Sequence, residues 1–136
     1  PTLQVYELWR DSKIFGQISP QNKIKLTNTV EKHIASFKRA LQTKVKIAFG
    51  TDTFEYPGKN SEELALMVRY GMKPIDVLKS ATSVAADLLG IQDETGIIVR
   101  GKSADIIAFR GDPLKDISVV ENVSFVMKEG KVYLDK

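Results

Sequence analysis

The chain lacks several features that would point to common classes of protein. It has no cysteine, which excludes a disulfide framework and thiol chemistry. It has a single histidine, His33, so a metal site made from this chain alone would have to use oxygen ligands. No apolar run approaches the about 18 residues that a membrane-spanning helix needs. We therefore expect no membrane association.

The charged residues also lack a strong bias. The formal net charge is only +3, and the basic residues are dispersed among acidic ones. Because a nucleic-acid-binding surface concentrates Lys and Arg on one face, we expect no nucleic-acid partner. No signal-like segment follows Pro1, and we expect a cytoplasmic protein.

Length and composition fit a folded unit. The chain has 136 residues, of which 43% are apolar, enough for one domain or for a piece of a larger protein. Its first residue is Pro1 and not Met, so we expect the natural start to lie upstream.

The segment 46–52 combines the pattern of a buried strand with a carboxylate. Residues 47–49 form a continuous apolar run, as in a strand that is buried on both faces. Gly50 ends the run and Asp52 follows it. In parallel α/β folds, catalytic groups lie just beyond the carboxyl ends of strands. Asp is also a common turn residue, so the segment alone leaves Asp52 as a cap or as a catalytic group.

A long helix is predicted before this strand. Ser19 as N-cap and Pro20 at the first helical position mark its start, and it ends near Lys44. One apolar stripe at helical spacing forms its buried face: Val30, Ile34, Phe37 and Leu41. His33 lies beside this stripe and is predicted to be a partly buried histidine. Residues 1–9 are predicted to be the end of a strand that runs into a loop or a short helix.

Three shorter helices are predicted after the strand. The first opens at residue 60 with a capping-box pair, Asn60 and Glu63, and ends at Gly71. The others start at Pro74 and at residues 80–83, and the last should end at Gly90 and turn Leu88 and Leu89 inward. Residues 53–59, between Asp52 and the first of these helices, are either a plain connector or a substrate-contacting loop.

The last third of the chain has strand periodicity. Strands are predicted at 97–99, 105–109, 123–127 and 131–134, the last two forming a hairpin in which Gly130 can take a positive φ. Residues 96–103 match the spacing of a phosphate-binding P-loop, but a strand is expected after them where that loop requires a helix. The change of composition near 90–96 predicts a boundary between residues 1–92 and 93–136.

Together these segments resemble the amidohydrolase superfamily, and in particular its imidazolonepropionase-like and Xaa-Pro dipeptidase-like branch. The residues that carry the resemblance stand in the order and spacing of the family: 47–52, 71–74, 81–90, 101–107 and 111–114. The resemblance implies an α/β fold in which residues 1–92 are the C-terminal part of a (β/α)8 barrel, a TIM barrel. Residues 1–5 would end its seventh strand and 47–49 would form its eighth. Residues 93–136 would belong to a small β-sandwich.

The resemblance also implies a role for Asp52. In this family an Asp at the end of the eighth strand binds a divalent metal and takes a proton from the metal-bound water, so Asp52 would be both metal ligand and catalytic base. One or two metal ions are expected in the complete site, zinc in most relatives, and the other ligands would lie before Pro1. Relatives often carry a small residue after this Asp and a His in the next loop, whereas residues 53–58 differ. The substrate-binding residues therefore stay open.

These inferences predict the C-terminal portion of a metal-dependent hydrolase that cleaves an amide C–N bond in a small molecule such as a dipeptide. The alternatives are a hydrolase of a cyclic amide or of a ring substituent in the same superfamily, and a non-catalytic binding module that stands alone. We expect the stretch itself to be inactive. We also expect a homo-oligomer, because open apolar strand edges favour association.

Overall fold

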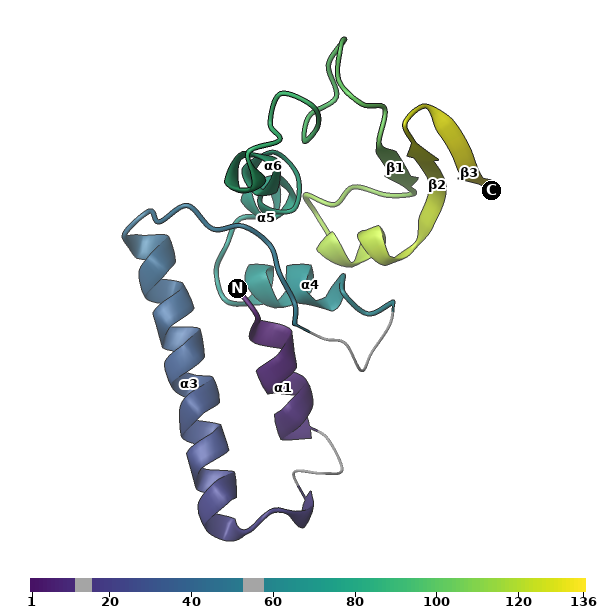
Figure 1. Ribbon diagram of the computed structural model, residues 1–136. Coiled ribbons are helices and arrows are strands. Elements are labelled where there is room, and N and C mark those ends of the chain that lie inside the picture. The colour runs from purple at the N-terminus through teal and green to yellow at the C-terminus, as the bar shows by residue number, and fades with distance from the viewer. Residues whose placement is uncertain (12–15, 53–57) are drawn as a thin grey trace.

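The computed structural model describes residues 1–11, 16–52 and 58–136 (Figure 1). In this part of the chain the helices come first and the strands last. The elements are α1 Leu3–Asp11, α3 Pro20–Gln42, α4 Glu62–Arg69, α5 Pro74–Ser80, α6 Ser83–Leu89, β1 Ile106–Phe109, the 3-10 helix η1 Ile117–Glu121, β2 Val123–Lys128 and β3 Lys131–Asp135.

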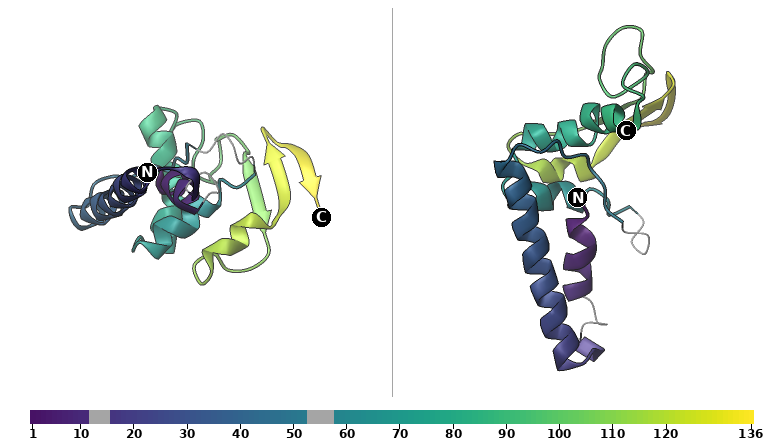
Figure 2. Two further views of the ribbon diagram at one scale, coloured as in Figure 1. Left: turned by 90° about the horizontal axis from the view of Figure 1, so that it is seen from below. Right: turned by 60° about the vertical axis from the view of Figure 1, so that its left-hand side comes forward.

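Helix α3 forms as the sequence predicts. The Ser19 hydroxyl accepts a hydrogen bond from the Asn22 backbone N–H at 3.3 Å, which satisfies one of the free donors at the start of the helix. Val30 and Phe37 of the predicted stripe are buried. Helix α1 lies alongside α3, and α4 packs across the end of α1 (Figures 1 and 2).

The expected strand end at residues 1–5 is wrong, because helix α1 already begins at Leu3. Leu3, Gln4 and Glu7 are all buried. Their spacing of i, i+1 and i+4 is that of one helix face, whereas a strand would bury alternate residues. The predicted short helix is therefore confirmed, and it starts earlier than expected.

Residues 47–49 are also not a strand in the described structure. The segment is extended and half-buried, and the Phe49 N–H donates to the Ser80 carbonyl at 3.0 Å. A strand requires a second strand with which to form a ladder. Within the described residues no strand lies beside this segment.

Helices α4, α5 and α6 appear at the predicted places, but α6 differs in what it buries. It ends at Gly90, which has φ 72°. Leu88 and Leu89 are 73% and 70% exposed, so the expectation that they turn inward is wrong. Ala86 is the residue that α6 buries in this structure.

The strands form a three-stranded antiparallel sheet in the order β1-β2-β3. Lys128 pairs with Lys131 across a two-residue turn, in which Glu129 and Gly130 have φ of 51° and 79°. Two positive φ values suit the right-handed twist of a hairpin, so the predicted hairpin is confirmed.

The predicted strand 97–99 is wrong, since these residues are exposed and no described strand pairs with them. Strand β1, and no helix, follows Ser103, which excludes the P-loop arrangement.

One core joins the helices to the last third of the chain. Its buried residues come from α1, α3, α4, α5 and η1: Leu3, Phe37, Leu64, Met67, Val77, Ile117 and Val120. The described residues therefore show helices packed with a small antiparallel sheet, and they contain no complete barrel. The division at residue 92 stays a prediction. No helix in this part of the chain is both long and apolar enough to span a membrane.

Candidate active site

Asp52 stands at the end of the extended segment, with its side chain exposed. Its φ of 55° lies in the left-handed region, which Asp tolerates better than most residues. The segment before it runs close to the N-terminal residue, since the Pro1 carbonyl oxygen lies 3.7 Å from the position of a Cβ built on Gly50. Asp52 therefore follows an extended segment, and the strand expected before it is not formed in the described structure.

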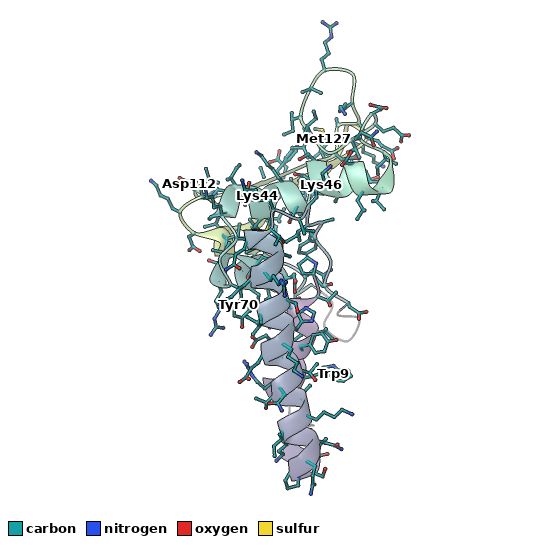
Figure 3. All side chains as sticks on the ribbon, turned by 90° about the vertical axis from the view of Figure 1, so that its left-hand side faces the viewer. Trp9, Lys44, Lys46, Tyr70, Asp112 and Met127 are labelled. Carbon is teal, nitrogen blue, oxygen red and sulfur yellow. The ribbon has the colours of Figure 1, made fainter. Side chains whose placement is uncertain are left out.

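Helices α5 and α6 hold the other side of this segment. The Ser80 carbonyl accepts from the Phe49 N–H, and Ser80 is buried with its hydroxyl donating to the Val77 carbonyl at 2.6 Å. Lys46 reaches Asp87 of α6 at 2.6 Å, and Figure 3 shows Lys46 where the chain leaves α3. Both of these charged side chains are largely exposed, so the pair contributes little, about 0–1 kcal/mol.

The described residues contain no group of three or more His, Asp or Glu side chains that could hold a metal ion. His33 is half-buried and its ring lies against that of Tyr6, with 4.7 Å between the centroids. Burial, and then the charge of the terminal ammonium, lower the pKa of His33. His33 is therefore partly buried, as predicted, and it is part of the contact between α1 and α3. Asp52 offers one exposed carboxylate, which suits a divalent metal as one ligand of a larger set.

Sequence reasoning missed a polar cluster between α1 and α4. The Glu63 carboxylate accepts from the Leu3 N–H at 3.0 Å and from the Gln4 N–H at 2.6 Å. The Gln4 amide donates to the Lys59 carbonyl at 2.8 Å and to the Glu62 carboxylate at 3.1 Å. Glu63 therefore caps α1 and does not complete the capping box predicted with Asn60. The N-cap of α4 is Ser61.

A second part of this cluster lies further along the same two helices. Tyr70 and Arg10 both donate to the carboxylate of Glu7, which is buried. Burial, together with the hydrogen bond to Glu7, raises the pKa of the Tyr70 phenol. Figure 3 shows Tyr70 beside α3, where the Lys38 ammonium lies 5.9 Å from the ring centroid. Charged and polar groups thus fix α1 against α4 along its length.

One signal in the sequence points to Glu63. It stands four residues before Met67, so both lie on one face of α4. Met67 is 0% exposed and so is Glu63. A carboxylate on the buried stripe of a helix needs partners inside the protein. The partners themselves could not be found from the sequence, because residues 1–5 were assigned to a strand.

The comparison with known proteins identifies the family. The sequence profile described as "Amidohydrolase family" matches residues 12–133, and the chain belongs to this family. Ochratoxinase from Aspergillus niger is 34% identical over 137 residues, which cover 97% of this chain and 28% of that protein. Imidazolonepropionase from Fusobacterium nucleatum subsp. nucleatum is 28% identical over 135 residues, which cover 93% of this chain and 31% of that protein.

Solved structures give the same result. The crystal structure of a Xaa-Pro dipeptidase with bound methionine in the active site superposes with a TM-score of 0.88 at 39% identity, over 98% of this chain and 34% of that one. The predicted resemblance to this superfamily and branch is confirmed. The chain spans about a third of the length of these relatives, so it corresponds to only part of each. Residues 53–57, which are either a plain connector or a substrate-contacting loop by their sequence, lie outside the described residues.

Proposed function

We propose that this chain is the C-terminal portion of a metal-dependent amidohydrolase that cleaves the amide C–N bond of a small molecule, most simply a dipeptide. The observation that carries the proposal is the likeness to the Xaa-Pro dipeptidase, which extends over 98% of the chain at 39% identity. The family match from 12 to 133 includes Asp52 and the helices that support it.

In this proposal Asp52 has two roles. Its exposed carboxylate is one ligand of a divalent metal, for which zinc is our prediction, and it is the base of the reaction. A metal bound there supplies a Lewis acid that lowers the pKa of a water molecule to about 7. With such a metal in place, Asp52 would accept the proton of the water that attacks the amide carbon and would pass that proton to the departing amine. The described residues include no group of three or more His, Asp or Glu side chains that could hold the ion, and in this proposal the further ligands lie before Pro1.

The remaining expectations about the complete protein are part of the same proposal. A cytoplasmic location, a homo-oligomeric state, the lack of a nucleic-acid partner and the lack of a membrane partner are predictions from the sequence. The complete barrel and a β-sandwich formed by the last strands are predictions as well.

A second candidate, in the same superfamily, is a hydrolase of a cyclic amide or of a ring substituent. The matches to imidazolonepropionase and ochratoxinase, at 28% and 34% identity, are the observation that keeps a substrate other than a dipeptide in view. A non-catalytic module is the third possibility and predicts no turnover at all.

The test is hydrolysis by the complete purified protein of three substrate classes: Xaa-Pro dipeptides, imidazolonepropionate and ochratoxin. We expect dipeptide cleavage that stops after chelation and returns on adding zinc. Preferred cleavage of either of the other substrates would replace the dipeptide proposal by the second candidate. No turnover of any of them with added metal, by a folded protein, would favour the non-catalytic module.

A further inference from the structure

The contact between α1 and α4 contains a carboxylate without access to solvent. Glu63 is 0% exposed, and its two oxygens accept from the backbone N–H groups of Leu3 and Gln4 at 3.0 and 2.6 Å. Both partners are donors. An ionised carboxylate can accept from both, whereas an amide in its place would turn a donor toward one of them. The two donors therefore favour an ionised carboxylate over an amide of the same size.

The start of α1 and the two residues ahead of it lie near the chain on both sides of Asp52. Before Asp52, Ile47 and Phe49 pack against the core cluster that contains Leu3 of α1, and the Pro1 carbonyl oxygen lies 3.7 Å from where a Cβ on Gly50 would stand. After Asp52, the Gln4 amide donates to the Lys59 carbonyl at 2.8 Å. The start of α1 is therefore a common support for the two ends of the stretch that carries the candidate catalytic residue.

Its pKa distinguishes Glu63 from a space-filling core residue. Burial raises its pKa to about 7, against the opposing effect of the two N–H groups and of the terminal ammonium. Keeping it ionised therefore costs folding stability, a cost that an apolar side chain would not have.

Asp52 has a φ of 55°, and a non-glycine residue keeps such a conformation only where its surroundings hold it.

We propose that Glu63 is a positioning residue for Asp52, because its buried carboxylate fixes the start of α1 to α4 and the start of α1 in turn borders the chain on both sides of Asp52. The inference rests on the proposed role of Asp52 in catalysis. Glu63 itself touches neither substrate nor metal in this proposal. It acts through α1, and its loss should displace the Asp52 carboxylate while the rest of the fold persists.

The test compares three variants of the complete protein. Glu63→Gln keeps the shape and loses one acceptor. Ile117→Ala creates a cavity in the same core, at η1, and serves as the control for lost stability. Glu31→Gln removes an exposed carboxylate from α3 and serves as the control for lost charge. Glu63→Asp is one methylene too short to reach both N–H groups from the same backbone position, and it is used if Glu63→Gln does not fold.

Two measurements are made on each variant. The first is hydrogen–deuterium exchange of residues 46–52, which does not depend on activity. The second is kcat and KM for a Xaa-Pro dipeptide, with the bound metal quantified. For Glu63→Gln we expect exchange about tenfold faster in this segment and kcat lower by about 100-fold with KM within about threefold. Ile117→Ala and Glu31→Gln should leave both the exchange of this segment and kcat close to wild type.

The proposal is overturned if Glu63→Gln leaves the exchange of residues 46–52 unchanged, or if Ile117→Ala with a similar Tm lowers kcat as much. It is also overturned if Glu63→Asp, used in place of a Gln variant that does not fold, leaves exchange and kcat at wild-type values. A failure of the proposed function looks different. Asp52→Asn would then keep full turnover, while the exchange measurement would still report whether Glu63 holds the segment.

Discussion

The buried carboxylate of Glu63 makes the stability of the protein depend on pH. Its pKa rises from an ordinary value of 4.5 to about 7 on folding, chiefly through burial. The folded state therefore binds this proton more tightly than the unfolded state. The resulting contribution to stability is fully present below about pH 4.5 and is lost as the pH rises through about 7.

The magnitude follows from the difference between the two pKa values. At about 1.4 kcal/mol for each pH unit, the difference between 4.5 and about 7 corresponds to about 3.5 kcal/mol at most. This is a large fraction of the about 5–15 kcal/mol that stabilise an ordinary domain. Glu63→Gln does not titrate, so the free energy of unfolding of the wild type relative to this variant isolates the effect.

The assay is chemical unfolding of both complete proteins at several pH values between 4.5 and 8. The signal that is followed must report the unfolding of the part of the protein that contains α4. We expect the stability of the wild type relative to Glu63→Gln to fall by up to about 3 kcal/mol across this range. A wild type that gains stability over Glu63→Gln as the pH rises would show that the Glu63 pKa is lowered in the fold, and would refute this reasoning.

Three further predictions concern the sheet side of the molecule and the chain as a separate piece. Gly96→Ala should destabilise the protein by about 1–3 kcal/mol more than Gly101→Ala in thermal unfolding. Both glycines have positive φ, but a Cβ on Gly96 would lie 2.6 Å from the Cβ of Ala86, whereas a Cβ on Gly101 meets nothing within 4 Å. Equal losses of stability would argue against the clash. The isolated 136-residue chain should hold no tightly bound zinc in equilibrium dialysis, and one zinc per chain would contradict the proposal that the other ligands lie elsewhere. The same chain should associate during sedimentation, because segment 46–49 has no strand beside it in the described structure; a cooperatively unfolding monomer at micromolar concentration would show a self-sufficient domain.

Local signals were sufficient for the elements that depend on their own residues. Helix α3 begins at a Ser-Pro pair and carries an apolar stripe, and both act within a single helix. The β2–β3 hairpin depends on Gly130 and on the alternation of its two strands. These features were predicted correctly because no distant partner decides them.

The errors fall where a distant partner decides the structure. Residues 47–49 and 97–99 have strand composition, but a strand exists only with a neighbour, and none is present in the described part of the chain. Leu88 and Leu89 have helical spacing, yet burial also requires an element to cover them. Glu63 has the spacing of a capping box, but its carboxylate binds a helix about 60 residues away in the chain. The candidate role of Asp52 came from the resemblance to the family, because the segment alone also allowed a turn cap.

The most direct test of the account is the turnover of Asp52→Asn in the complete protein, measured with the bound metal quantified and the fold checked by circular dichroism. Asn keeps the size of the side chain and cannot accept the proton. We predict an intact fold and a kcat lower by about two to four orders of magnitude, or more if metal is also lost. Turnover close to wild type at full metal content would contradict the account and would make Asp52 a turn residue.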